Sequence, residues 1–194
     1  MQKIVLLFFF SILLSWGSED NWKTLRIDNN PKAAGLDFLI KYPDGWTVKA
    51  GERPHVLHNI VSENKAMVIL VQTLPMEVSI EDAEDMFTLE DLKEMMPKRG
   101  IFQNGIKTKL EGQPTWIFMY LTTSERLGKV IVDCVLNCLV VYKKYLIHLQ
   151  SHYVISQDEL KAMPTTPALA EKYQAATEEA MRMFNTLVIN DRYK

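Results

Sequence analysis

The hydrophobic residues along most of the chain alternate with polar ones or form short runs between turn residues, a pattern that predicts β-strands. The strands expected in the first part of the chain span residues 22–27, 38–42, 46–49, 54–61 and 66–72. Those expected in the second part span residues 105–111, 115–123, 129–142 and 145–155. The run 66–72 is almost continuously apolar, as in a strand that is buried on both faces. Strands therefore dominate the predicted structure.

Two short turns are predicted between successive strands. Pro43-Asp44-Gly45 predicts a reversal, because proline presets φ for the first turn position and glycine admits positive φ. The two residues Lys143 and Lys144 separate the two longest strands and predict a hairpin.

Helical periodicity appears between residues 79 and 96. Ser79 stands three residues before Asp82, and Thr88 three before Asp91, so each pair resembles a helix-capping box. Four apolar residues then form a helical stripe that Pro97 and Gly100 terminate. The residues of this stripe are Leu89, Leu92, Met95 and Met96.

Two further helices are expected near the C-terminus. Ser156 with Glu159 marks the start of a short helix, and Thr166 with Pro167 marks the start of the last helix. The last helix carries apolar residues at three- or four-residue steps on one face and should lie across a sheet. This face comprises Leu169, Tyr173, Ala176, Ala180, Phe184 and Leu187.

The chain contains no internal repeat, low-complexity tract or linker, so one domain is expected. Short turns between successive strands imply mainly antiparallel pairing. The predicted fold class is α+β: an α/β/α sandwich with a mainly antiparallel sheet covered by helices.

Residues 1–17 have the layout of a signal peptide. One lysine precedes an apolar core, and Ser15-Trp16-Gly17 places small residues at the −3 and −1 positions of a cleavage after Gly17. The core is shorter than the ~20 residues of a spanning helix, although a retained membrane anchor is the alternative. The expected domains are a signal peptide, 1–17, and a single domain, 18–194. No cysteine follows the core for lipid attachment, and no later run is long enough for membrane insertion.

Composition agrees with an exported globular domain. The 22 basic and 24 acidic residues give a net charge of −2, which offers no general attraction to nucleic acid or anionic lipid. Removal of the leader with its single lysine would leave 177 residues and a net charge of −3. The absence of an Asn-x-Ser/Thr sequon favours a bacterial envelope, so a periplasmic or secreted location is expected.

The four histidines do not form a recognisable metal motif. His148 and His152 share one strand face but lie ~13 Å apart by strand rise, too far for two ligands of one zinc without another element. His55 and His58 fall on opposite faces of a predicted strand, with no neighbouring cysteine or carboxylate. A structural role is therefore expected for all four, and no metal ligand is assigned.

Cys134 and Cys138 lie on one face of the strand 129–142, ~13 Å apart, whereas a disulfide needs a Cα separation below about 7 Å. They could bond only if residues 135–137 formed a turn or bulge. These three residues include no glycine, so two buried free thiols are the favoured interpretation.

The most acidic stretch, residues 77–94, has eight carboxylates and only Lys93 as a basic residue. The carboxylates are those of Glu77, Glu81, Asp82, Glu84, Asp85, Glu90, Asp91 and Glu94. A solvated face of capped helices is one interpretation. A docking surface for a basic partner, or for loosely bound calcium, is the other, and the residue order excludes an EF-hand.

No G-x-S-x-G motif, phosphate-binding glycine loop or paired nucleophile and histidine occurs in the chain. A non-enzyme without a cofactor is therefore predicted, and no catalytic or cofactor-binding residue is assigned.

The segment 38–46, FLIKYPDGW, resembles the opening strand and turn of PsbP-like proteins and their bacterial relatives of the DcrB type. The order of later elements is similar as well: a middle helix, a strand with LEGQP at 110–114, a long hairpin, and a closing helix that ends near residue 186. This resemblance covers most of residues 22–190. It implies an α/β/α sandwich on an antiparallel sheet.

Members of this group are mostly accessory proteins, among them a photosystem assembly subunit, a nuclear transport factor and exported bacterial proteins. The family brings no shared catalytic residues.

The leading functional hypothesis is thus an exported, soluble, non-catalytic accessory protein of the bacterial envelope that binds another protein through residues 77–94 or an exposed sheet face. The alternative is a metal-dependent envelope hydrolase that uses His148, His152 and acidic residues. A third hypothesis is an adaptor anchored by its leader.

Overall fold

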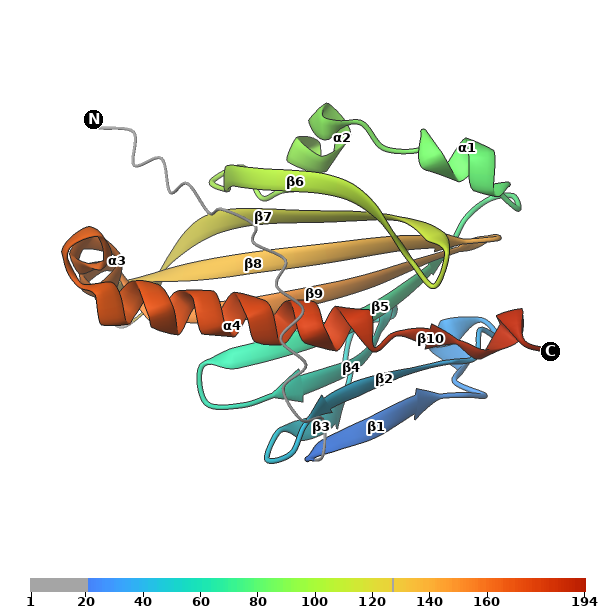
Figure 1. Ribbon diagram of the computed structural model, residues 1–194, viewed down its shortest axis with the longest axis horizontal. Coiled ribbons are helices and arrows are strands. Elements are labelled where there is room, and N and C mark those ends of the chain that lie inside the picture. The colour runs from blue at the N-terminus through green and yellow to red at the C-terminus, as the bar shows by residue number, and fades with distance from the viewer. Residues whose placement is uncertain (1–20, 127) are drawn as a thin grey trace.

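The strands of the computed structural model, which describes residues 21–126 and 128–194, form two antiparallel sheets (Figure 1). The predicted signal peptide, 1–17, lies outside the described residues. No helix in the described ranges is long and apolar enough to cross a membrane.

The larger sheet has seven strands in the order β3-β4-β5-β9-β8-β7-β6, and every neighbouring pair is antiparallel. In this spatial order the strands are β3 (Thr47–Ala50), β4 (Val56–Val61), β5 (Lys65–Thr73), β9 (Tyr145–Ser156), β8 (Lys129–Tyr142), β7 (Gln113–Arg126) and β6 (Ile101–Leu110). The smaller sheet consists of β1 (Trp22–Ile27), β2 (Phe38–Pro43) and β10 (Val188–Ile189).

The turn at Pro43-Asp44-Gly45 forms as predicted, with Gly45 at φ 85°. Strands β2 and β3 on its two sides do not pair with each other, because β2 pairs with β1 and β10 while β3 pairs with β4. The turn therefore passes the chain from the small sheet to the large one.

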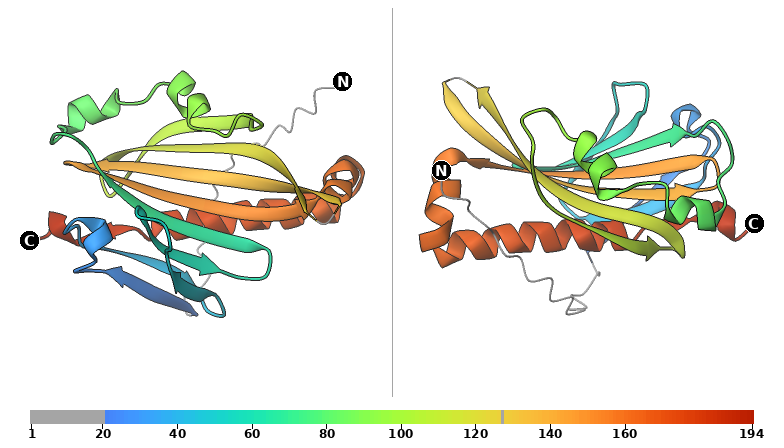
Figure 2. Two further views of the ribbon diagram at one scale, coloured as in Figure 1. Left: turned by 180° about the vertical axis from the view of Figure 1, so that it is seen from behind. Right: turned by 90° about the horizontal axis from the view of Figure 1, so that it is seen from above.

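The helices lie on both sides of the large sheet, with α1 and α2 above it and the long α4 below it (Figures 1 and 2). Their bounds are α1 (Ile80–Glu84), α2 (Leu89–Glu94), α3 (Gln157–Ala162) and α4 (Pro167–Asn185). Short 3-10 turns are η1 (Pro31–Ala33), η2 (Met163–Thr165) and η3 (Asn190–Arg192). This arrangement confirms the predicted α+β sandwich.

The helix starts follow the predicted capping residues. Ser79 accepts a hydrogen bond from the Asp82 amide, and Thr88 and Ser156 each form a complete capping box. The predicted apolar face of α4 is confirmed too. Its residues Tyr173, Ala176, Ala180 and Phe184 are buried and pack against strands of the large sheet.

Strand β8, rather than β5, is buried on both faces. Every residue from Cys134 to Tyr142 is buried, with one face turned to the α4 side and the other packed among residues of α1, α2 and β7. The prediction of two-faced burial for 66–72 is wrong, because residues 66, 68 and 70 are only half-buried. Neither α1 nor α2 extends over β5, so one face of that strand stays open (Figure 2).

Two boundaries near the middle of the chain also differ from prediction. Strand β6 begins at Ile101 rather than at residue 105, and a bulge between Phe102 and Asn104 interrupts its early register. The helical stripe predicted before β6 is only partly buried, since Leu92 is buried but Leu89 and Met95 are exposed. The reason is that α2 has only six residues and so presents fewer than two turns to the sheet.

Candidate functional site

A chain of hydrogen-bonded polar side chains crosses β8 and β9 on the face opposite α4. Asn137 lies in its middle and is almost fully buried, and its Oδ1 accepts hydrogen bonds from Gln150 Nε2 and His148 Nε2, both at 2.9 Å. Farther along, His152 lies 3.1 Å from Gln150 Oε1 through Nε2 and 2.8 Å from Asp133 Oδ2 through Nδ1. We call these five residues the sheet network.

The hydrogen-bond directions define the state of His148. Since Asn137 Oδ1 is an acceptor, His148 must carry its proton on Nε2. Burial and, to a smaller extent, the neighbouring His152 lower the pKa of His148 to about 4. His148 is therefore a neutral hydrogen-bond donor near pH 7.

The network does not gather the ligands that the hydrolase hypothesis requires. His148 is hydrogen-bonded to the side-chain amide of Asn137, and His152 contacts one carboxylate, that of Asp133. Within residues 21–126 and 128–194 no group of three or more His, Cys, Asp or Glu side chains is placed to hold a metal ion. Glu84 of α1 and the following Asp85 instead contact Lys109 and Lys107 of β6.

Asp133, Asn137 and Gln150 were not singled out from the sequence. The signal was nonetheless present, because a two-residue turn at 143–144 pairs Tyr142 with Tyr145 and so fixes the register of the whole hairpin. That register sets Asn137 opposite Gln150.

The other two histidines are separate from this network. His55 is exposed just before β4, which begins at Val56 rather than at residue 54 as predicted, so the expected opposite-face arrangement with His58 does not apply. His58 is half-buried, and burial lowers its pKa. Its Nδ1 has no hydrogen-bond partner in the described part of the chain.

Cys134 and Cys138 are both buried free thiols, as predicted. Cys134 Sγ lies 2.8 Å from the Tyr173 hydroxyl of α4, and burial raises its pKa to about 12. Burial also raises the pKa of Cys138. Neither thiol is suited to nucleophilic chemistry at neutral pH.

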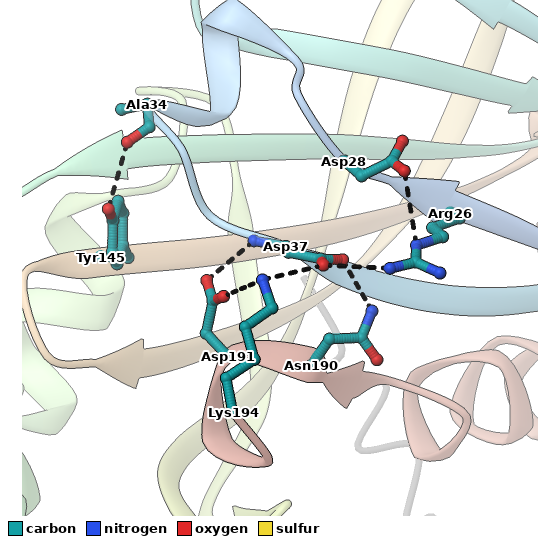
Figure 3. A network of polar contacts seen from close by, with 8 residues as sticks. All are labelled: Arg26, Asp28, Ala34, Asp37, Tyr145, Asn190, Asp191 and Lys194. Atoms are coloured by element: carbon teal, nitrogen blue, oxygen red, sulfur yellow. Dashed lines mark hydrogen bonds and ion pairs between the residues drawn. The ribbon is translucent and has the colours of Figure 1, made fainter.

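A second polar cluster ties the C-terminus to the small sheet around Asp37 (Figure 3). The Asp37 carboxylate is 7% exposed; it accepts a 2.7 Å hydrogen bond from Asn190 and lies 3.1 Å from both Arg26 and Lys194. These donors, Asn190 first, hold the pKa of Asp37 below its ordinary value. The Asp191 carboxylate accepts a hydrogen bond from the backbone amide of Asp37, so this cluster links the C-terminal segment to the residue before β2.

The acidic stretch 77–94 forms the outer side of α1, α2 and their connection. Three of its carboxylates are engaged in ion pairs, Glu84 with Lys109, Asp85 with Lys107 and Glu90 with Lys93. Asp82 and Asp91 are engaged at helix starts. Glu77, Glu81 and Glu94 are exposed and have no ion-pair partner among the described residues.

Large apolar side chains are exposed along the same segment. Of eight such side chains in the described ranges, five fall between residues 76 and 101. They are Met76, Ile80, Leu89, Met95 and Ile101, with exposed fractions from 42% to 72%. Exposed apolar groups beside carboxylates are typical of an interaction surface. We call these five residues, together with Glu77, Glu81 and Glu94, the acidic surface.

Comparison with known proteins identifies the fold. No family model and no curated protein sequence matches the chain. Among solved structures, the Saccharomyces cerevisiae Ran-binding protein Mog1p matches with TM-score 0.50 and 10% identity over 87% of this chain and 96% of its own. The cyanobacterial PsbP of Synechocystis sp. PCC 6803 matches with TM-score 0.46 and 12% identity over 86% and 92%.

LpqN of Mycobacterium tuberculosis, involved in cell envelope biogenesis, matches with TM-score 0.48 and 12% identity over 88% and 92%. The match to Mog1p shows a shared fold. A PsbP, the family that the sequence resemblance names, is among the structures matched.

Proposed function

We propose that this chain is an exported, non-catalytic accessory protein of the bacterial envelope that binds a basic protein partner on the acidic surface. The observation that carries the proposal is the combination, along residues 76–101, of carboxylates without ion-pair partners among the described residues and exposed apolar side chains. Apolar contacts supply binding free energy, while the carboxylates select a partner of opposite charge and speed its approach.

The fold is compatible with this role. Mog1p is a Ran-binding protein, so a chain of this fold is able to bind another protein. Because unrelated functions occur on one fold, the partner of Mog1p is not transferred, and the proposal depends on the surface of this chain.

A charge variant tests the acidic surface. Glu77→Gln, Glu81→Gln and Glu94→Gln combined remove three exposed negative charges, and Glu52→Gln, Glu63→Gln and Glu171→Gln combined remove three exposed charges elsewhere. Each protein is immobilised and exposed to envelope extract at 50 and 300 mM salt, and retained proteins are identified by mass spectrometry. We expect one basic protein that the wild type and the control retain at low salt, that the surface variant loses, and that high salt releases.

The apolar component is tested separately with Met76→Ser and Ile101→Ser, the two most exposed apolar members of the acidic surface at 72% and 62%. Binding of the same partner should weaken at both salt concentrations, since apolar contact is not screened. Equal retention by the wild type and both surface variants would contradict the proposal.

Export is tested by the intact mass of the protein recovered from the envelope fraction. Cleavage after Gly17 leaves Ser18 as the first residue, whereas a retained anchor leaves Met1.

A further inference from the structure

A cavity of about 300 Å³ lies at one end of the large sheet, beside the acidic surface, with which it shares Ile80. Its walls come from four places in the chain: α1 and the residues before it, the start of β7, the turn between β8 and β9, and η3. In Figure 1 the β6–β7 turn lies apart from the β8–β9 turn, with α1 above and the C-terminal segment below. Pairing of β7 with β8 begins only at Thr115 and Val140, so the sheet is open beyond them.

The inner wall of the cavity is apolar and includes one amide. Val78, Ala83 and Val141 line it, and the last two are fully buried. The Gln113 side chain lines it as well and is only 5% exposed. Its Nε2 makes one long hydrogen bond, 3.4 Å to the Glu111 carbonyl, and no donor in the described ranges reaches its Oε1.

The Gln113 amide makes one long hydrogen bond and so keeps hydrogen-bonding capacity for an occupant of the cavity. The volume equals that of about ten water molecules, at about 30 Å³ each, and lies at the lower end of the range of small-molecule sites. The cavity thus has room for a ligand and a polar group that such a ligand could satisfy.

The charged residues around the cavity are both cationic. Lys143 and Arg192 line it, and no lining residue is acidic. Lys143 makes no ion pair with any described carboxylate, and Arg192 makes a single long one, 3.5 Å to Glu111. Glu111 also accepts a shorter 2.7 Å hydrogen bond from the Tyr193 hydroxyl, so Arg192 retains donors for another anion.

We propose that this cavity binds a small organic anion, a carboxylate on a short apolar body. The apolar part lies against Val78, Ala83 and Val141. The carboxylate pairs with Lys143 and Arg192 and accepts a hydrogen bond from the second N–H of Gln113 Nε2. This inference does not rest on the protein-binding function proposed above, because the cationic and amide groups that define the cavity, Lys143, Arg192 and Gln113, lie outside the acidic surface.

The test is a ¹H–¹⁵N NMR titration of the protein with hexanoate at constant ionic strength. We expect a saturable response with a dissociation constant on the order of 1 mM, as for a small probe. The Gln113 side-chain amide should shift together with backbone amides of residues 78–83 and 141–143. The neutral analogue 1-hexanol should bind about tenfold more weakly, since it lacks the charge-assisted hydrogen bonds.

The two lysines of the β8–β9 turn provide a matched pair of variants. Both are exposed, and only Lys143 lines the cavity. Lys143 has φ 51°, a conformation that asparagine tolerates, so Lys143→Asn should fold normally. We expect Lys143→Asn to weaken hexanoate binding about tenfold and Lys144→Asn to leave it unchanged. Arg192→Gln should act like Lys143→Asn.

Three results would overturn the proposal. One is a hexanoate response that does not saturate or does not include Gln113. The second is equal binding of hexanoate and 1-hexanol. The third is an equal effect of Lys143→Asn and Lys144→Asn, with all variants giving the wild-type spectrum before titration.

Discussion

Replacing His148 with glutamine should make the stability of the protein less dependent on pH between 7 and 4.5. In the folded chain burial lowers the pKa of His148 from 6.5 to about 4. As the pH falls, the unfolded chain therefore binds a proton at this position before the folded chain does. The stability contributed by neutral His148 is fully present above pH 6.5 and is lost as the pH falls toward 4. Glutamine cannot titrate, but its amide can still donate to Asn137 Oδ1.

The size of the effect follows from the two pKa values. Each pKa unit of difference corresponds to about 1.36 kcal/mol, so the difference between 6.5 and about 4 is worth about 3 kcal/mol at its limit. Between pH 7 and pH 4.5 about 2 kcal/mol of it is lost from the wild type. Other groups titrate in the same interval, among them His58, so the meaningful quantity is the difference between wild type and variant.

Urea unfolding at pH 7 and pH 4.5, followed by tryptophan fluorescence, measures this difference. We expect the free energy of unfolding of His148→Gln to fall by about 2 kcal/mol less than that of the wild type. The exposed His55→Gln serves as control and should follow the wild type. A pH dependence of His148→Gln within about 0.5 kcal/mol of the wild type would refute the burial argument.

Other predictions concern the thiols, the C-terminal cluster and the core. In native protein, iodoacetamide should label neither Cys134 nor Cys138 within an hour at pH 8, and denatured protein should gain two labels without reductant; a requirement for reductant would show a disulfide. Asp37→Asn should lower stability at pH 6, and its deficit relative to wild type should shrink below pH 4, because a carboxyl of lowered pKa stabilises only while ionised. Denaturant titrations at both pH values measure this, and a constant deficit would argue against the charge interaction. Phe184→Ala should cost about 3–5 kcal/mol in urea unfolding, since Phe184 is fully buried between α4 and the sheet, and a cost below 1 kcal/mol would contradict that packing.

Much of the fold could be predicted because local signals and long-range packing agree. Ser79, Thr88 and Ser156 start helices through bonds to residues three positions on, which a linear sequence displays directly. The apolar face of α4 is equally visible because one helix is long enough to repeat its period.

Other features depend on contacts that no local pattern encodes. The strand β10 has two residues and exists because the chain after α4 meets β2, so residues 188–189 carry no strand signal of their own. Strand β8 is buried on both faces and β5 on only one. This difference depends on where α1, α2 and α4 lie over the sheet.

The candidate sites divide in the same way. The acidic stretch and the shared face of His148 and His152 follow from spacing alone. The cavity combines residues 78, 113, 141 and 192, which only the folded chain brings together.

Strand β6 has one unpaired edge, and edges of this kind invite association with other chains. The bulge at Phe102 and Asn104 breaks the regular row of backbone groups there, and Lys107 and Lys109 place two charges on the strand. Any strand that added to β6 would meet those charges and disturb their pairs with α1. The lysines that neutralise part of the acidic stretch therefore also protect the protein from aggregation through its longest free strand.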